Sequence, residues 1–201
     1  MKTILRTYLR PAIVITLLLT IVTGFIYPGI VTGLAQVIFP SQANGSLVYV
    51  NGKPVGSELI GQYWTSAKYF HGRPSAALDM VNGTPVPYAA DNSGASNQGP
   101  TNATLVKTVR QRIAELKKEN PDAPSGPIPV DLVTASGSGL DPDISVAAAL
   151  YQAPRVAKAR GLSLTQVNQL ITEHTQGRFL WIFGEPFVNV LEINLALDVM
   201  K

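Results

Sequence analysis

The chain has 201 residues, of which 46% are hydrophobic and only 14% are charged, and this apolar content excludes an intrinsically disordered protein. Lys2, Arg6 and Arg10 account for the net charge of +3, because the 191 residues that follow hold 13 basic and 13 acidic side chains. A nucleic-acid-binding protein gathers basic side chains on one face, so the composition argues against that class. The absence of cysteine excludes disulfides, thiol nucleophiles, iron–sulfur clusters, thiolate zinc sites and a lipoprotein anchor.

The first forty residues predict a membrane anchor. No charged residue occurs between Arg10 and Lys53, and 19 of the 29 residues in the segment 11–39 are apolar. A membrane-spanning helix needs about 20 predominantly apolar residues. We therefore predict a basic tip at residues 1–10, a transmembrane anchor with its juxtamembrane segment at 11–39, and one exported domain at 40–201.

The orientation of this anchor follows from the positive-inside rule. Three cations precede the apolar segment and the next one is Lys53, so we expect a cytoplasmic N-terminus and an extracytoplasmic domain. A cleaved signal peptide is the alternative, but the apolar segment exceeds the length of about 7–15 residues that is usual for a signal-peptide core. Pro28-Gly29 is expected to kink or end the helix.

Small residues recur along the anchor. Thr16, Thr20 and Gly24 are spaced by four residues, and Gly29 and Gly33 form a GxxxG pair. Small side chains at this spacing let a second transmembrane helix approach closely. We therefore predict that these five residues pack against a helix of another subunit, although glycine is also common in membrane helices in general.

The exported segment predicts a mixed α+β domain. Leu47–Val50 indicates a strand that enters a hairpin at Asn51-Gly52, because Asn-Gly favours a type I′ turn. Residues 91–101 are polar and contain glycine, which indicates a loop. Val130–Thr134 predicts a short strand or an extended segment.

Helices are predicted in the second half of the chain. An apolar stripe with a spacing of three to four residues starts near Asn102 and ends at Asn120-Pro121. Asp141-Pro142 resembles an N-cap followed by proline at the first helical position. This second helix should be interrupted at Pro154, and a further short helical piece at Arg155–Arg160 should be closed by Gly161.

The C-terminal quarter predicts one more helix and two strand-like segments. Ser163 should cap a helix that stops near Gly177. Phe179–Phe183 and Phe187–Leu197 follow. The second of these mixes alternating with continuous apolar positions, so its pattern does not decide between strand and helix.

Motifs of known catalytic chemistry are missing. The sequence has no GxxxxGK[ST], DKTG, GxSxG or HExxH, and these are signatures of phosphate binding, aspartyl phosphorylation, serine hydrolysis and zinc proteolysis. Thr65 lies three residues before Lys68, but the companion motifs of Ser–Lys enzymes are absent. The spacing of His71 and His174 does not suggest a metal site. The sequence therefore predicts neither a catalytic residue nor a metal ligand.

Two segments rich in glycine and hydroxyl groups precede predicted helices. Their candidate residues are Asn97, Gly99, Pro100, Thr101 and Asn102 in the first, and Ser136, Gly137, Ser138, Gly139 and Asp141 in the second. A loop at a helix N-terminus presents free N–H groups that can bind an anion. The same groups can order a tight turn, and without a lysine nearby the structural role is favoured.

At these segments the chain resembles the C subunit of the Kdp potassium-transporting ATPase of bacteria and some archaea. The resemblance covers nearly the whole length in the expected order. Its most distinctive part is the block PVDLVTASGSGLDP at 129–142, and the other matching segments are 39–47, 56–57, 59–62, 69–76, 99–102, 151–152, 155–161, 184–186 and 188–191.

Three positions depart from the family pattern. Asp143 stands where the pattern has histidine, Phe187 stands where it has arginine, and Trp181 stands where it has a small residue. Roles that depend on that histidine or that arginine are therefore not carried over to this chain, whereas the fold and the role in assembly are.

The resemblance implies a non-catalytic, single-pass accessory subunit of the bacterial plasma membrane. It would be needed for assembly and activity of a high-affinity, ATP-driven potassium uptake complex. Its partners would be the channel-like A subunit, the ATP-hydrolysing P-type B subunit and the small F subunit. A role in raising the ATP affinity of the B subunit, as a "catalytic chaperone", has been proposed for the family. No cofactor of this chain is implied, because the complex handles ATP and potassium.

The predicted topology bears on that chaperone role. ATP is cytoplasmic, whereas most of this chain is expected outside, so we favour a domain that stabilises or caps the outer face of the A subunit. Two alternatives come from other classes. A membrane-anchored extracytoplasmic hydrolase would need a hydroxyl, a base and an acid that converge in a pocket, and a free extracytoplasmic binding protein would lose the anchor by cleavage.

Overall fold

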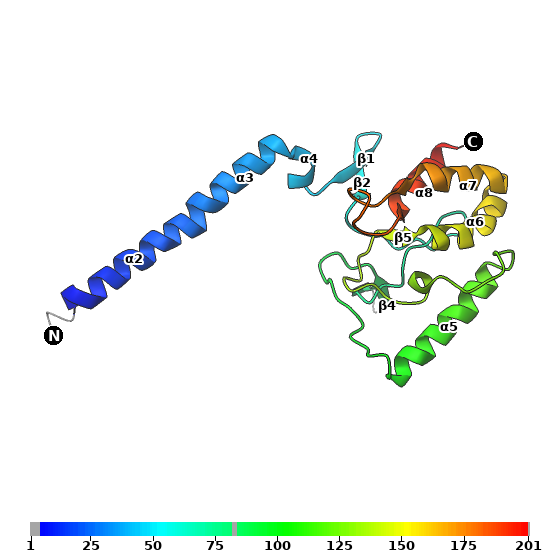
Figure 1. Cartoon of the computed structure of the whole chain (residues 1–201), viewed down its shortest axis with the longest axis horizontal. Helices are drawn as coiled ribbons and strands as arrows, with labels where there is room; N and C mark the ends of the chain where they lie inside the picture. The colour runs from blue at the N-terminus through cyan, green and yellow to red at the C-terminus, as the bar shows by residue number, and fades with distance from the viewer. Residues whose placement is uncertain (1–4, 82–83, 201) are drawn as a thin grey trace. The chain divides into compact units, whose positions relative to one another are not determined.

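The computed structural model describes residues 5–81 and 84–200, so Lys2 of the predicted basic tip lies outside the described residues. The chain divides into two compact units, Met1–Leu47 and Val48–Lys201, which are described separately below (Figure 1). The first unit is one long apolar helix with a short helical turn after it, and the second mixes helices with short antiparallel strands. The predicted α+β class with an N-terminal apolar helix is therefore confirmed.

The helix of the first unit runs continuously from Arg6 to Ile38, over 33 residues, and the mean hydropathy of its most apolar 18-residue window is 2.2. Its length and composition suffice to cross a membrane. Its segments are η1 (Leu5–Leu9), α2 (Arg10–Ile21), η2 (Val22–Ile26) and α3 (Tyr27–Ile38), and the short α4 (Pro40–Ala43) follows. None of the residues of α2, η2 and α3 is buried within the chain, so this apolar surface needs lipid or another helix to cover it.

Pro28 does not end the helix, contrary to one of the two sequence-based expectations. The segment η2 just before it is a π-turn, in which the Tyr27 N–H donates to Val22 O, five residues back. Proline has no N–H and its ring crowds the carbonyl one turn earlier. A widened turn is a known way to accommodate such a defect inside a helix.

The strands of the second unit form three small antiparallel sheets. They are β1 (Leu47–Val50) with β2 (Lys53–Ser57), β3 (Leu78–Val81) with β4 (Thr84–Pro87), and the three-stranded order β5-β7-β6 from Asp143–Ser145, Phe187–Asn189 and Thr175–Gln176. The predicted hairpin at Asn51-Gly52 is confirmed. Both residues have positive φ, at 51° and 75°, as a type I′ turn requires.

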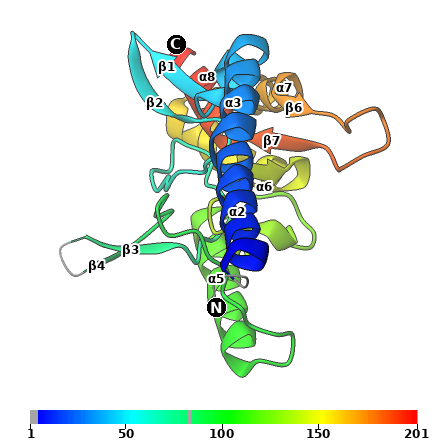
Figure 2. The ribbon, with the colours of Figure 1, turned by 90° about the vertical axis from the view of Figure 1, so that its left-hand side faces the viewer.

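The helices of the second unit are α5 (Ala103–Glu119), α6 (Val146–Arg160), α7 (Leu164–Glu173) and α8 (Val190–Val199). The core lies where α6, α7 and α8 meet the three-stranded sheet (Figure 1), and its fully buried side chains include Phe70, Ile144, Val156, Val167, Ile171, Val188, Ile193 and Leu197. Figure 2 shows the hairpins β1–β2, β3–β4 and β6–β7 at the periphery of this unit.

Several predicted helix boundaries are confirmed by their caps. The Asn102 side chain accepts from the Thr104 N–H at the start of α5. Ser163 and Gln166 form a reciprocal capping box at the start of α7. Gly161 closes α6 in the left-handed conformation, with φ at 69°.

The predicted helix start at Asp141-Pro142 is wrong. Residues Asp143–Ser145 instead pair with β7 as strand β5, and α6 begins after Ser145, whose side chain accepts from the Ala148 N–H. Pro154 does not interrupt α6 either. Its neighbours Ala153 and Arg155 are buried, so packing on both sides outweighs the missing hydrogen bond, a cost of about 3 kcal/mol.

Three further segments differ from their predictions. Val130–Leu132 forms a single 3₁₀ turn, η3, rather than a strand. Helix α7 ends at Glu173 rather than near Gly177, because Thr175–Gln176 pairs with β7. The apolar segment Phe179–Phe183 is the turn between β6 and β7, and the segment after it divides into β7 and α8, with Asn189 as the cap of α8.

Candidate functional site

The five small residues predicted as a helix-packing face, Thr16, Thr20, Gly24, Gly29 and Gly33, all lie exposed on the helix of the first unit. A Cβ atom added at any of the three glycines would meet nothing within 4 Å. A five-residue step in an α-helix turns by about 500°, which would point Gly29 about 140° away from Gly24. The π-turn η2 adds one residue to the turn between them, which offsets about 100° of this angle, so Gly29 and Gly33 lie within about 40° of the side that carries Gly24.

In the second unit, the family-like segment Tyr69–Ser75 has no regular secondary structure, yet it crosses the core at Phe70, which is fully buried. Buried backbone groups need partners, and amide side chains supply them. The Phe70 N–H donates to Asn194 Oδ1 (2.8 Å) and Asn194 Nδ2 donates to Phe70 O (2.9 Å). Gln152 holds His71 in the same two-way manner, at 2.8 Å and 3.1 Å.

Arg155 completes this polar network from α6. Its Nη1 donates to Ala67 O (2.6 Å) and to Tyr69 O (3.0 Å), its Nη2 donates to Gln152 Oε1 (2.7 Å), and its Nε donates to Asn120 Oδ1 (3.0 Å). Burial lowers the pKa of Arg155, and nearby Glu119 opposes that shift. Arg155 thus uses four of its five N–H donors, and such a network fixes one conformation of the segment that it binds.

His71 stays neutral at physiological pH. Burial and the charge of Arg155 lower the pKa of His71 from 6.5 to about 4. Its Nδ1 lies 3.7 Å from Glu119 Oε2, which is too long for a strong pair to reverse that shift. The Nε2 atom lies 3.1 Å from Ser66 O, and this contact assigns the single ring proton to Nε2.

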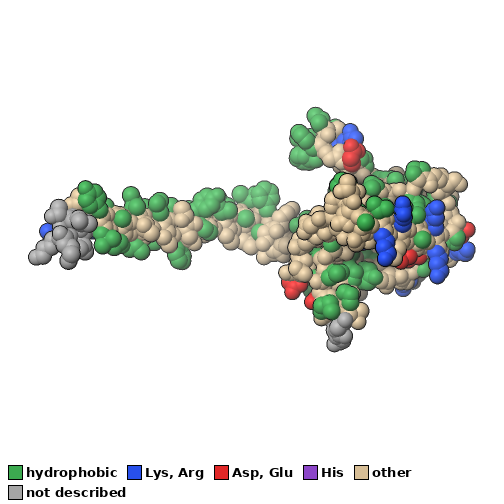
Figure 3. All heavy atoms as spheres, turned by 90° about the horizontal axis from the view of Figure 1, so that it is seen from below, with side chains coloured by type: hydrophobic (Ala, Val, Ile, Leu, Met, Phe, Trp, Pro, Cys, Tyr) green, Lys and Arg blue, Asp and Glu red, His purple; other side chains and the backbone are tan. Residues whose placement is uncertain are grey.

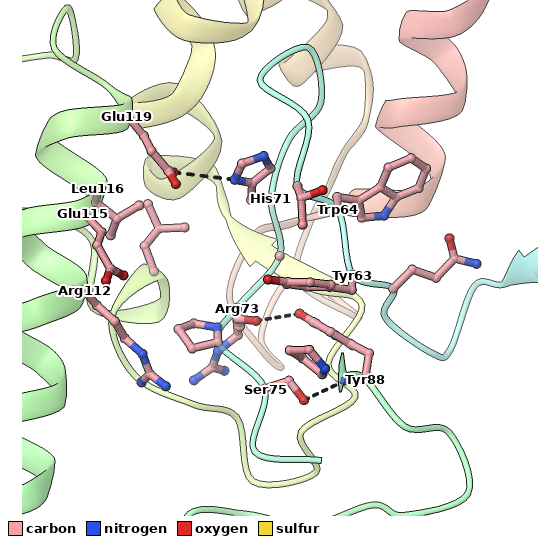
Figure 4. Close-up of a pocket in the computed structure, with 16 residues that line it drawn as sticks. Tyr63, Trp64, His71, Arg73, Ser75, Tyr88, Arg112, Glu115, Leu116 and Glu119 are labelled. Carbon is pink, nitrogen blue, oxygen red and sulfur yellow. Dashed lines mark hydrogen bonds and ion pairs between the residues drawn. The ribbon is translucent and has the colours of Figure 1, made fainter. Parts of the chain in front are cut away.

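A cavity of about 380 Å³ lies between the segment 71–75 and α5 (Figure 4). Its polar lining includes His71, Arg73, Ser75, Tyr88, Arg112, Glu115 and Glu119. The two arginines and two glutamates balance in charge, and the Nε atom of Arg73 is buried without a hydrogen-bond partner among the described residues. The cavity offers hydrogen-bonding groups of both kinds and carries no net charge that selects an ion.

Ser75 is the hydroxyl that the hydrolase alternative would need in this cavity. Its Oγ donates to Gly139 O (2.6 Å) and accepts from the N–H groups of Ala77 and Tyr88 (3.1 Å each). The proton of this hydroxyl is therefore held by a backbone carbonyl rather than by a base. A nucleophilic serine needs an adjacent base, so Ser75 acts as a structural connector between two loops.

Ser93 and Gly94, just before the candidate residues of the first glycine-rich segment, contact the centre of the second segment. Gly94 N donates to Ser138 O (2.8 Å), and the Ser93 hydroxyl donates to the same carbonyl (3.0 Å). Gly139 has φ of 69°, and an added Cβ would lie 2.6 Å from Gly94 O and 2.7 Å from Ala77 N. Only glycine fits this close approach, which accounts physically for Gly139 in the SGSG pattern.

The predicted loop residues thus divide into two groups. Among residues 136–141, the Gly139 N–H donates to the Ser136 hydroxyl and the Leu140 N–H donates to the Ser138 hydroxyl. These N–H groups serve the turn itself, and a strand follows rather than a helix. In the first segment Asn102 caps α5, whereas no role beyond the loop emerges for Asn97, Gly99, Pro100 and Thr101.

Asp141 and Asp143, two residues apart in the sequence, also interact in the structure. Asp141 Oδ2 accepts from Arg73 Nη1 (3.0 Å), and its Oδ1 accepts from the Asp143 N–H (3.1 Å). Burial, with a smaller contribution from the charge of Asp141, raises the pKa of Asp143 to about 6. Asn189 Nδ2 donates to Asp143 Oδ1 (3.1 Å) and partly offsets this effect.

Sequence reasoning missed the residues that hold the family-like segment, namely Asn120, Gln152, Arg155 and Asn194. The available signal was a polar residue on the apolar stripe of a helix. Gln152 and Asn194 are both almost completely buried, and buried polar side chains nearly always have a hydrogen-bond partner. A polar residue on the apolar stripe of a helix therefore indicates that its side chain binds the backbone of a segment that is distant in the sequence.

Comparisons with known proteins identify the family of this chain. Residues 9–199 match the family described as the c chain of the K⁺-transporting ATPase, KdpC. The chain is 54% identical to the potassium-transporting ATPase KdpC subunit of Rhodopseudomonas palustris (strain BisB18), over 96% of this chain and 98% of the relative. The KdpC subunit of Polynucleobacter asymbioticus is 55% identical, over 96% and 99%, and that of Sorangium cellulosum is 53% identical, over 95% and 97%. The chain therefore belongs to the KdpC family of potassium-transporting ATPase subunits.

Proposed function

We propose that this chain is a non-catalytic accessory subunit of a high-affinity, ATP-driven potassium uptake complex. It is anchored in the plasma membrane by the helix Arg6–Ile38, with its N-terminus in the cytoplasm and its second unit outside. It is needed for assembly and activity of the complex. Its partners are the ion-conducting A subunit, the ATP-hydrolysing B subunit and the small F subunit.

The anchor supports this assignment in two ways. No side chain in the most apolar 18-residue window of this helix is buried. The surface of that window is therefore free to meet lipid and partner helices. Arg6 and Arg10 begin the helix and no further charge occurs until Lys53, which favours the cytoplasmic N-terminus. The face that carries Gly24, Gly29 and Gly33 is the side on which we place a partner helix.

The second unit supports a structural rather than a chemical role. Its buried polar side chains, among them Gln152, Arg155 and Asn194, form hydrogen bonds to the backbone. The Ser75 hydroxyl is likewise bound by backbone carbonyl and N–H groups. Such a rigid domain suits a cap that stabilises the outer face of the A subunit. An effect on the ATP affinity of the B subunit would then pass through the complex, since the nucleotide binds on the other side of the membrane.

Membership of the KdpC family, over 191 residues of the chain, is the observation that carries the proposal. The first test is co-purification of a tagged copy with the other three subunits, with potassium-stimulated ATPase activity measured with and without this chain. We expect that omission abolishes both the stable complex and the stimulated activity. A complex that assembles and transports potassium without this chain would contradict the proposal.

The second test addresses sidedness. Alkaline phosphatase fused after Lys201 should be active, and green fluorescent protein at the same position should be dark, because the former folds only outside the cytoplasm and the latter only inside. The reverse result would place the second unit in the cytoplasm and would favour direct contact with nucleotide. Variants of the second unit that keep complex yield and potassium affinity but weaken ATP binding would argue against the outer cap.

A further inference from the structure

The hairpin between β6 and β7 carries an unusual apolar tip. Its five consecutive residues, Phe179–Phe183, are 61–92% exposed, and Trp181 is the most exposed of them at 92%. Figure 2 shows this hairpin as an arm that leaves the body of the second unit, and the space-filling view shows hydrophobic side chains on a projecting knob (Figure 3). A contiguous apolar surface of this kind marks an interaction site.

The backbone of the tip is strained in order to display these side chains. Leu180 and Trp181 have positive φ, at 51° and 65°, which is rare for bulky residues. The hairpin β1–β2 of the same chain makes such a turn with Asn51-Gly52, the ordinary choice. Strain that persists where a simple substitution would relieve it indicates that the large apolar side chains are needed.

Four of the five backbone N–H groups of the tip have a hydrogen-bond partner within the hairpin. The N–H groups of Phe179 and Phe183 donate to each other's carbonyls, each at 2.9 Å, and those of Trp181 and Ile182 donate to Arg178 O and Phe179 O. A hairpin that docks into a protein commonly does so through open backbone groups at a strand edge. Internal hydrogen bonds are instead what a hydrocarbon environment demands, since lipid offers no partners.

The charges that flank the tip neutralise each other. Arg178 Nη2 donates to both carboxylate oxygens of Glu185, at 2.8 Å and 2.7 Å. The tip between them has no charged residue. An apolar end that carries tryptophan, with its charges gathered at the neck, matches the boundary between lipid headgroups and acyl chains, where tryptophan is enriched.

The second unit is also tethered close to lipid. The long helix ends at Ile38 and the second unit begins at Val48, so even a fully extended connection spans only about 30–35 Å. A domain of this size has a radius of gyration of about 15 Å, so the tether lets the tip reach the bilayer. We propose that Phe179–Phe183 inserts into the lipid leaflet on the side of the second unit and holds the domain against the membrane.

This inference rests on the proposed membrane anchor, and tryptophan fluorescence tests it separately. The chain has only two tryptophans, Trp64 and Trp181, and neither lies in the helix. The full chain is reconstituted into phosphatidylcholine liposomes with or without bromine on the acyl chains. We expect brominated lipid to cause a loss of Trp181 emission, and Trp181→Phe, which leaves Trp64 alone, to remove that loss.

A second pair of variants separates insertion from folding. Leu180→Asp combined with Ile182→Asp should lose the quenching by brominated lipid, whereas Met80→Asp, at a 64% exposed position of β3, should keep it. Both variants should unfold at the temperature of the parent chain, because all three side chains are exposed. Quenching that survives the double substitution would overturn the inference.

The outcomes distinguish the anchor from the tip. A chain that does not float with liposomes lacks the anchor, which overturns both proposals. A chain that floats while Trp181 is quenched by aqueous acrylamide and not by brominated lipid has its tip in water, which overturns only the insertion. Quenching of tryptophan emission by brominated lipid and by acrylamide is also compared between the parent chain and Trp181→Phe in the assembled complex. Shielding of Trp181 from both quenchers there would assign the tip to a protein partner and would also overturn the insertion.

Discussion

Gln152 shows how one side chain fixes a segment of irregular backbone. It accepts from the His71 N–H and from Arg155 Nη2, and it donates to His71 O. Gln152→Leu keeps the volume but leaves these buried groups without partners. We expect the free energy of unfolding to fall by about 2–4 kcal/mol, as measured by denaturant unfolding in detergent.

The control for this substitution is Gln169→Leu, at an exposed position of α7 where the side chain donates to Glu173 Oε1 across one helical turn. Its effect should stay within about 0.5 kcal/mol. Equal effects at the two positions would mean that the network around His71 contributes no more than a surface glutamine.

Gly137 and Gly139 give a matched pair within the same motif. Gly139 has a left-handed backbone and no room for a Cβ, whereas a Cβ at Gly137 would meet nothing within 4 Å. Gly139→Ala should therefore lower the free energy of unfolding by at least about 2 kcal/mol, and Gly137→Ala should change it by no more than about 0.5 kcal/mol. Thermal unfolding of the two variants side by side checks this prediction, and a larger effect at Gly137 would contradict it.

At the scale of elements, the π-turn before Pro28 sets which residues of the anchor share a face. If that face meets a partner helix, Gly33→Leu should reduce the yield of the co-purified complex several-fold, because a leucine side chain separates two closely packed backbones. Ile30→Leu, an exposed position of the same helix with conserved volume, should leave the yield unchanged. Complex recovered at the parent level with Gly33→Leu would place the partner on another face.

Elements whose signals are local were predictable from the sequence. The caps Asn102, Ser163 and Gly161 and the Asn51-Gly52 turn act within four residues, and all four are where the pattern placed them. The helix start expected at Asp141 failed because pairing of Asp143 with Asn189, 46 residues away, makes that segment a strand.

The site depends even more on distant partners. The SGSG motif could be recognised in the sequence, but its contact with Gly94 and Ala77 could not. The amide side chains that hold Phe70 and His71 are 124 and 81 residues away along the chain, respectively. Hydrophobic periodicity cannot predict such contacts, because it indicates only which face of one helix or strand is apolar.

At the scale of the whole molecule, two partly buried groups, His71 and Asp143, oppose each other in the dependence of stability on pH. His71 has a lowered pKa of about 4, so the unfolded chain binds more protons between pH 4 and 6.5 and stability is lost on acidification through that range. Asp143 has a pKa raised from 3.8 to about 6, so the folded chain binds more protons and stability is lost as the pH rises through that range. The two effects largely cancel between pH 4 and 6.

Asp143→Asn removes the contribution of Asp143 to the pH dependence of stability and leaves that of His71. At pH 7.5 the variant should be more stable than the parent chain by about 1–2 kcal/mol, because a desolvated charge beside Asp141 is gone. Below about pH 4 the difference should vanish, and between pH 6.5 and 4 the variant should lose stability more steeply through His71. Unfolding free energies from pH 3.5 to 8 check both signs, and a less stable variant at pH 7.5 would contradict the prediction.

The pairing of Phe70 with Asn194 has a consequence for how the protein is made. A polypeptide leaves the ribosome from its N-terminus, so Phe70 emerges 124 residues before the amide that will hold it. Domains dominated by such non-local pairings fold slowly and expose apolar surface in the meantime. The second unit can reach its final state only after translation has delivered α8, so a nascent chain stalled before that helix would be a client for chaperones and proteases rather than a shortened but working subunit.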